Sequence, residues 1–210
     1  MRTWAADDPK AGLMERKREV ILKAALEAFL EDGYAGSSVN RIAESAGVSI
    51  KTLYRHFDNK DDLFVAVIQT ACVANPGAEE PPWLDLPPLE GLTQAGGHHL
   101  PFVLSAEQLA LYRVVTREAP RFPELGKRYR SDVIGNQLAQ LTRYFDRWPD
   151  SLRTKIRDPL RGARTFAALL QADLVETALL GGPTPGPDEL WTRAHDAAAG
   201  LLALIEADLI

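Results

Sequence analysis

Several features are scarce or missing in this chain of 210 residues, and each absence excludes a class of protein. Cys72 is the only cysteine, which excludes an internal disulfide bond. We interpret it as a small buried apolar residue, with a redox sensor as the alternative. No run of about 18 apolar residues occurs, so no segment is expected to cross a membrane. The N-terminal stretch MRTWAADDPK has acids and a proline where a signal peptide needs an apolar run, so the cytoplasm is the expected location.

Motifs of enzymes and of cofactor sites are also missing. The sequence has no G-x-S-x-G, no Walker loop, no G-x-G-x-x-G and no H-E-x-x-H. We therefore expect no catalytic residues, no enzyme activity and no cofactor. The adjacent pair His98 and His99 is the one hint of a metal. Neighbouring residues of a helix point about 100° apart, and no second group of ligands is visible, so no metal site is expected.

What the chain does contain is typical of an ordinary globular protein. It is 46% hydrophobic and 25% charged, and it is long enough for one large or two small cores. The net charge of −5 argues against a uniformly basic surface. Between Arg41 and Lys60, however, four cations stand against two acids. A second basic group, residues 16–18, lies just upstream, so the positive charge is local and the acidic excess lies elsewhere.

The stretch from residue 37 to 57 has the pattern of two short helices joined by a tight turn. Ser37 or Ser38 is placed to cap the first helix. Four apolar residues then recur at spacings of three and four: Val39, Ile42, Ala43 and Ala46. Gly47 follows, where a helix typically ends in a left-handed conformation. Ser49 is expected to cap the second helix, which runs to about residue 57.

This second helix has an apolar side and a polar side. Leu53 and Phe57 are four residues apart and are expected to face a core. Lys51 and Arg55 lie on the opposite side at about 100° per residue. The residues that flank these two cations are Thr52 and Tyr54. Such groups suit phosphate oxygens and base edges in a DNA major groove, and two helices in this arrangement indicate a helix-turn-helix.

The same residues resemble a known family. Gly33-Tyr34, then S-V-x-x-I-A-x-x-A-G-V-S (38–49) and T-L-Y-x-H-F-x-x-K (52–60), are similar to the DNA-binding domain of the TetR family of bacterial regulators. The resemblance spans roughly residues 15–64. Arg41 stands where the family often has an acid, and Lys51 where it often has a small residue. Both add positive charge near the expected DNA surface, so no operator sequence is carried over from a relative.

The resemblance implies a fold and a function. The fold is all-α, with an N-terminal three-helix helix-turn-helix domain joined to a C-terminal helical bundle, about nine helices in total. The expected divisions are a flexible arm (1–12), the DNA-binding domain (13–60) and a ligand-binding and dimerisation domain (61–210). The expected function is that of a sequence-specific repressor. Its partners are a double-stranded DNA operator, a second copy of the chain and a small, largely apolar effector, with no membrane.

The candidate DNA contacts differ in their expected roles. Lys51 and Arg55 are candidates for base or phosphate contacts, and Arg41 and Ser49 lie on or beside the same surface. The residues expected mainly to bond phosphates are Ser38, Thr52, Tyr54, His56 and Lys60; for Lys60 the family resemblance adds this role, and a helix start favours anions. Ile50 either touches a thymine methyl group or packs at the edge of the core.

Further along, proline and glycine divide the chain. Residues 74–101 are rich in both and predict an irregular linker to about residue 88, either a loop or a lid, followed by a short, weak helix. Helical patterns follow at 105–118, 123–148, 159–180 and 187–209. The last two are apolar over more than one face. We therefore expect them to pack on a partner as well, giving a four-helix interface across a two-fold axis, with a fuller monomer core as the alternative.

The C-terminal helices are expected to enclose the effector, an inference that comes mainly from the resemblance. Aromatic side chains that suit an apolar pocket, or else plain core, are Phe102, Tyr112, Trp148 and Phe166. Arg164 and Asp173 are polar residues in apolar surroundings, placed to orient a ligand or to pair across a dimer. The alternative function is a DNA-binding dimer without a small-molecule effector, either constitutive or regulated by a protein partner. A closed cavity distinguishes the two.

Overall fold

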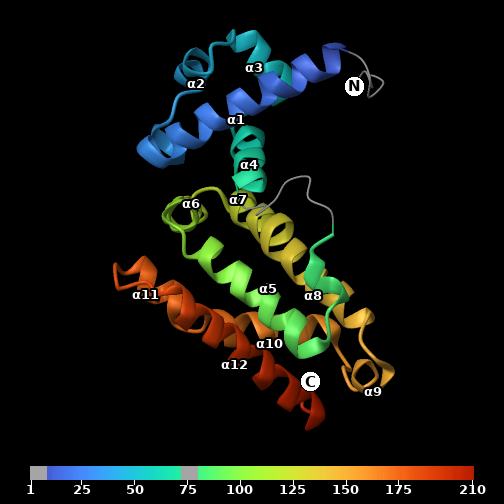
Figure 1. Cartoon of the computed structure of the whole chain (residues 1–210). Helices are drawn as coiled ribbons and strands as arrows, with labels where there is room; N and C mark the ends of the chain where they lie inside the picture. The colour runs from blue at the N-terminus through green and yellow to red at the C-terminus, as the bar shows by residue number, and fades with distance from the viewer. Residues whose placement is uncertain (1–8, 72–79) are drawn as a thin grey trace. The chain divides into compact units, whose positions relative to one another are not determined.

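A computed structural model describes the backbone of residues 9–71 and 80–210, with side chains from residue 12 onward. Most of the expected N-terminal arm, Cys72 and the beginning of the Pro/Gly-rich linker lie outside these ranges. The described residues are helical, without strands, so the predicted all-α class is confirmed (Figure 1). None of the described helices is both long and apolar enough to cross a membrane.

The chain forms two compact units. Unit 1 comprises residues 1–73 together with 111–129, and unit 2 comprises residues 74–110 together with 130–210. This division differs from the expected boundary after residue 60, because residues 61–73 and 111–129 belong to the same unit as residues 13–60. Each unit has its own buried core, and each is described by itself below.

Unit 1 is built on α1 (Pro9–Gly36), α2 (Val39–Ser45), α3 (Ile50–His56) and α4 (Lys60–Ala71). It also contains the end of α6 (Ala106–Glu118) and all of α7 (Pro123–Arg128). Three aromatic rings form the centre: Phe29 and Phe64 have centroids 4.8 Å apart, and Tyr34 and Phe64 5.1 Å. Phe122, just before α7, packs 4.8 Å from Tyr34. The long α1 is kinked at Gly33, whose φ of 71° interrupts the helix.

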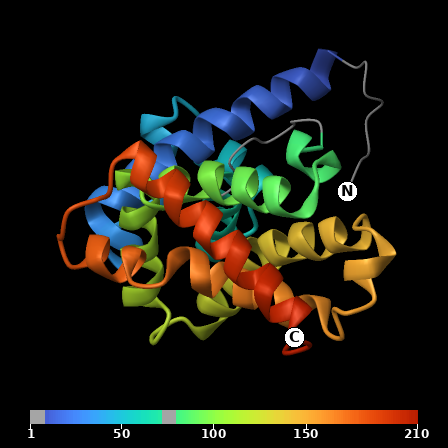
Figure 2. The same cartoon turned by 60° about the horizontal axis from the view of Figure 1, so that its bottom comes forward.

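Unit 2 contains the 3-10 turn η1 (Pro82–Asp85), α5 (Pro88–Val103), α8 (Gly135–Asp146), α9 (Asp150–Arg153), α10 (Pro159–Gln171), α11 (Leu174–Leu179) and α12 (Pro187–Glu206). Helix α5 packs on α12 and α10, and α10 also packs on α8 (Figure 2). The predicted helix at 123–148 contains a π-helical segment, η2 (Tyr129–Ile134), between α7 and α8. Buried side chains from α5, α8, α10 and α12, and from the segments between them, fill the core. They include Trp148, Phe166, Ala194 and Leu201.

The prediction of a short, weak helix from residue 89 is wrong. Helix α5 has 16 residues and lies at the centre of unit 2, with Pro101 inside it. A side-chain carbon on Gly97 would lie 2.2 Å from the Trp191 ring, and one on Gly96 would lie 2.8 Å from a methyl group of Leu170. The glycines weaken the helix intrinsically, but they let α5 and α12 approach closely, and the packing outweighs the propensity.

Ahead of α5, residues 80–87 are fixed to α8. The Tyr144 hydroxyl donates to the carbonyl oxygens of Leu86 and Pro87, at 2.9 and 3.0 Å. The Arg147 guanidinium binds Glu80 at 2.6 Å and Asp85 at 3.1 Å. The described part of the linker is therefore held as a strap on α8.

Candidate nucleic-acid interface

The turn between α2 and α3 has the geometry that the sequence predicts. Gly47 has a φ of 65°, in the left-handed region that a residue with a side chain avoids. Its amide bonds the Glu44 carbonyl at 3.0 Å, and the Val48 amide bonds the Ala43 carbonyl at 3.0 Å. These two bonds satisfy carbonyls left free at the end of α2. Helix α3 therefore begins only three residues after the glycine.

The two expected serine caps have different outcomes. The Ser49 side chain accepts a bond from the Thr52 amide at 3.1 Å, which confirms the cap of α3. Ser38 occupies the cap position of α2, but its side chain forms no capping bond, so the capping role expected of Ser37 or Ser38 is wrong. The Ser37 hydroxyl instead donates to the Tyr34 carbonyl at 3.0 Å. It closes the end of α1 rather than the start of α2.

Helix α3 is anchored from behind by apolar side chains. Leu53 is fully buried, and Phe57, which follows the helix, is 4% exposed. Ile42 and Ala43 of α2 are buried in the same core. The predicted division of the helix into two sides is present, because its outer residues Lys51 and Arg55 are exposed.

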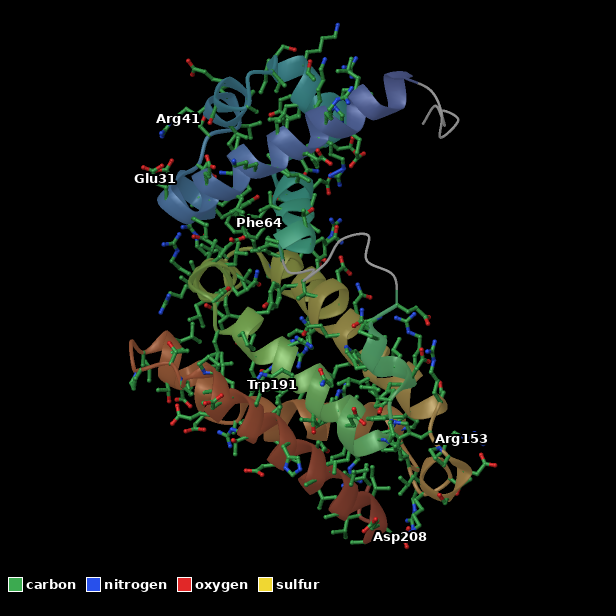
Figure 3. All side chains as sticks on the ribbon, in the orientation of Figure 1. Glu31, Arg41, Phe64, Arg153, Trp191 and Asp208 are labelled. Carbon is green, nitrogen blue, oxygen red and sulfur yellow. The ribbon has the colours of Figure 1, made fainter. Side chains whose placement is uncertain are left out.

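The other outer residues of this surface extend it on both sides. Tyr54 is 48% exposed and Ile50 is 37% exposed, so neither is buried in the core. Arg41 projects from α2 (Figure 3) and lies 3.2 Å from Asp32. An exposed pair of this kind contributes little to stability and can exchange its partner. The surface thus offers three cations, a phenol and an apolar side chain.

Two of the predicted contacts, Thr52 and His56, are less available. Thr52 is half-buried, and its hydroxyl lies 2.8 Å from that of Ser49. Burial, and then the neighbouring Arg55 and Arg18, lower the pKa of His56 below its usual value. The ring is therefore neutral at neutral pH and adds no charge. Arg18 of α1, which lies 5.1 Å over the Phe57 ring, places a cation beside the end of α3 instead.

Lys60, at the start of α4, points into unit 1. Its ammonium donates to the Ser37 carbonyl at 2.6 Å and lies 4.7 Å from the centre of the Tyr34 ring. Burial lowers its pKa below the usual value, while the charge of Glu118 acts in the opposite direction. The ammonium is thus already bound within the protein. No local pattern predicts this, because Tyr34 and Ser37 lie at the end of α1 and Glu118 lies at the end of α6, both distant from Lys60 along the chain.

The six candidate ligand residues do not form one group. Tyr112 lies in unit 1, where it packs 6.1 Å from Tyr129. Trp148 and Phe166 are buried in the core of unit 2, and Phe102 is half-buried there. Asp173 is exposed and binds Arg193 at 2.7 Å. Of the two alternatives expected for Trp148 and Phe166, a pocket lining or plain core, their burial agrees with plain core.

Arg164 lies at an open hollow of unit 2 between α10 and α12. The hollow has a volume of about 480 Å³ and is lined by Arg161, Arg164, Thr165, Ala168, Leu169, Ala172 and Arg193. Three guanidinium groups thus surround an apolar floor. None of the four aromatic candidates lines this hollow.

Comparison with known proteins identifies both parts of the chain. The family of bacterial regulatory proteins named after tetR matches residues 21–67, and the C-terminal domain of AefR-like transcriptional repressors matches residues 90–204. A stretch of 140 residues is 31% identical to the HTH-type transcriptional regulator TcmR of Streptomyces glaucescens, covering 62% of each chain.

The HTH-type transcriptional activator FasR of Mycolicibacterium smegmatis is 42% identical over 55 residues, which is 26% of this chain and 25% of that protein. The chain therefore matches between about a quarter and 62% of the length of these curated relatives. A solved TetR-family regulator from Mesorhizobium loti has a TM-score of 0.73 and 25% identity, covering 91% of this chain and 97% of that chain.

Proposed function

The chain belongs to the TetR family of bacterial regulatory proteins, and on this premise we propose that it is a sequence-specific repressor released from DNA by a small, largely apolar effector. Proteins of this family are DNA-binding transcription regulators. The observation that carries the proposal is the surface of α3, where Lys51, Tyr54 and Arg55 are exposed while Leu53 and Phe57 fix the helix from behind. The operator lies on the chromosome, so the proposed place of action is the bacterial cytoplasm.

The operator is read by two copies of α3. Family members act as dimers, and we assign the contact in this chain to α10 and α12. In α12 the residues Ala199 and Ala203 are exposed and face away from the buried side, and small residues let helices of a partner approach closely. A two-fold axis places both α3 helices on one duplex, about 34 Å or a near multiple apart.

The side chains of the surface divide by role. Lys51 and Arg55 contact base edges or phosphates, Arg41 and Tyr54 contact phosphates, and Ile50 packs on a thymine methyl group. Ser38, Ser49 and Thr52 lie at the helix starts, where backbone amides and hydroxyls fix the register on the phosphates. His56 takes part as a neutral group.

The salt dependence of operator binding tests the DNA surface. After an operator is selected from random duplexes, affinity is titrated against salt for Lys51→Ala and Arg55→Ala. Each phosphate contact that is lost lowers the slope of log affinity against log salt by about 0.9. Arg153→Ala, an exposed arginine of α9 in unit 2, is the control and leaves affinity and slope unchanged. Unchanged affinity and slope in both α3 variants would remove these residues from the interface.

The effector is proposed to bind unit 2 and to act by population shift. A ligand weakens operator binding only by its differential affinity for the two arrangements of the DNA-binding units. Among the candidate residues, Phe102 and Arg164 have accessible side chains, and Asp173 sets the position of Arg193 at the hollow. Trp148 and Phe166 become ligand contacts only where the core opens.

A screen of apolar compounds separates this proposal from the dimer without an effector. Compounds are scored for a raised unfolding temperature and then for release of the operator. At least one stabilising compound is expected to release DNA in proportion to its occupancy. A screen in which every stabilising compound leaves operator affinity unchanged supports the dimer without an effector.

A further inference from the structure

A buried carboxylate lies in unit 1 outside the surface described above. Glu118 ends α6, its side chain is 4% exposed, and it is the one acid that is fully buried among the described residues. Its Oε1 accepts a bond from the Arg117 Nε at 3.0 Å. Its Oε2 is buried and has no hydrogen-bond partner within the described part of the chain. A buried, half-satisfied carboxylate is costly, so its retention needs a reason.

The Arg117 guanidinium packs directly against the backbone of Gly33. A side-chain carbon on Gly33 would lie 1.7 Å from the Arg117 Nη2, so only glycine leaves room for the guanidinium at the kink of α1. Two consecutive residues at the end of α6 therefore face the region where α1 ends. Arg117 fills the space beside Gly33, and the charge of Glu118 raises the pKa of Lys60 against the burial that lowers it.

Lys60 lies where α1, α2 and α4 meet. It is the first residue of α4, four positions after the end of α3, and its ammonium binds the Ser37 carbonyl two residues before α2 begins at Val39. The Tyr34 ring lies under the ammonium, and the Tyr34 hydroxyl donates to Asp61. One ammonium thus connects the end of α1, the start of α2 and the start of α4.

We infer that Glu118 is a positioning residue for DNA binding: its buried carboxylate holds the Lys60 ammonium on the Ser37 carbonyl and so fixes α2 and α3 relative to α1 and α4. The inference rests on the proposed function and changes one part of it. Lys60 acts inside the protein and contributes no phosphate contact. The carboxylate is kept because the partly buried ammonium needs a negative charge beside it once solvent is excluded.

A double-mutant cycle on the full chain tests this role. Operator affinity and its salt dependence are measured for Glu118→Gln, Lys60→Met and the double variant. Each single variant is expected to bind about tenfold more weakly, because the remaining charge has lost its counterpart. The double variant binds no more weakly than either single variant, and the salt slope stays unchanged in all three. Glu107→Gln, an exposed acid on the same helix, is the control.

Amide hydrogen exchange separates positioning from general destabilisation. In Glu118→Gln the amides of residues 37–60 are expected to exchange faster, whereas those of α8, α10 and α12 keep their rates. Faster exchange throughout the chain would reduce Glu118 to an ordinary stabilising residue. If Glu118→Gln does not fold, the salt slope of Lys60→Met still decides.

The outcomes distinguish this inference from the proposed function. A slope that falls by about 0.9 in Lys60→Met, with additive losses in the cycle, makes Lys60 a phosphate contact and overturns the inference while DNA binding stands. A wild-type chain that binds no operator overturns the proposed function. In that case the exchange pattern and a double-mutant cycle on unfolding still test the positioning of α2 and α3.

Discussion

At the scale of single residues, two glycines of unit 1 have positive φ for different reasons. Gly47, at 65°, has open space where a side chain would be, so Gly47→Ala measures the conformational cost alone, about 1–2 kcal/mol. Gly33, at 71°, also has Arg117 in that space. Gly33→Ala is therefore expected to cost more, about 2–3 kcal/mol from the backbone strain together with the displaced guanidinium.

Urea unfolding of both variants checks this ranking. Gly12→Ala, within α1 and with no side-chain carbon contact and no positive φ, is the control and is expected to be neutral or to stabilise by up to about 1 kcal/mol. Equal losses at Gly33 and Gly47 would show that Arg117 moves aside without cost. In that case the packing of Arg117 against Gly33 contributes nothing to the stability of unit 1.

His99 makes the stability of unit 2 depend on pH. Its Nε2 lies 3.1 Å from the Gln171 amide nitrogen, and burial lowers its pKa from 6.5 to about 4. Between these two values the unfolded chain binds more protons than the folded chain, so stability falls as the pH decreases. The fall is at most about 1.4 kcal/mol per pH unit and the contribution is fully present above pH 6.5.

Unfolding free energies from pH 7.5 to 4.5, compared between the wild type and His99→Gln, measure this contribution. Glutamine keeps a hydrogen-bonding group but does not titrate, so the variant's curve is flatter in this window. His98→Gln replaces the exposed neighbour, which stacks edge-on with Trp191, and it retains the wild-type slope. Parallel curves for the wild type and His99→Gln would assign the pH dependence to other groups.

At the scale of helices, the sequence predicts what local chemistry decides. Gly47 as the end of α2 and Ser49 as the cap of α3 were both predicted, because each effect acts within a few residues. The length of helix α5 was not predicted, because its glycines are explained by contacts with Trp191 and Leu170, which lie far along the chain in α12 and α10. The exposed polar side of α3 was accessible to prediction for the same local reason, whereas the inward turn of Lys60 depends on the end of α1 and on Glu118, which are distant along the chain.

The predicted helix at 159–180 is divided by a strained residue. Ala172, between α10 and α11, has a φ of 32° and a ψ of −118°, a conformation that suits glycine. Ala172→Gly is therefore expected to be neutral or to stabilise unit 2 by about 0.5–1 kcal/mol, opposite in sign to an ordinary substitution in a helix. Ala168→Gly, one turn earlier within α10, is the matched control and loses about 1 kcal/mol. Denaturant titration of the two variants decides; a loss in both would show that Ala172 is unstrained.

At the scale of the whole molecule, the order of residues along the chain does not follow the division into compact units. A boundary after residue 60 follows from the helix-turn-helix motif, but it separates residues that pack together in space. Arg128 of α7 binds Asp62 of α4 at 3.3 Å, and Phe122 packs on Tyr34. These contacts join segments more than sixty residues apart, and no periodicity within one helix indicates them.

The proposed dimer is tested on the outer side of α12. Ala199 and Ala203 are exposed, lie four residues apart and face away from the buried side of the helix. In an isolated chain, Ala199→Glu and Ala203→Glu cost only a few tenths of a kcal/mol, because both residue types favour helices. In a two-fold interface each substitution introduces two buried charges and weakens association by several kcal/mol. Sedimentation equilibrium is therefore expected to show dimers for the wild type and monomers for both variants.

Operator binding is expected to weaken in parallel, because two linked DNA-binding units act at a high effective concentration on one duplex. Ala139→Glu, an exposed alanine on α8, serves as the matched control and leaves both assembly and DNA affinity unchanged. A wild-type dimer that survives both α12 substitutions would move the interface to another face of unit 2. The arrangement of the two α3 helices proposed for the operator would then lose its structural basis, even with the surface of α3 intact.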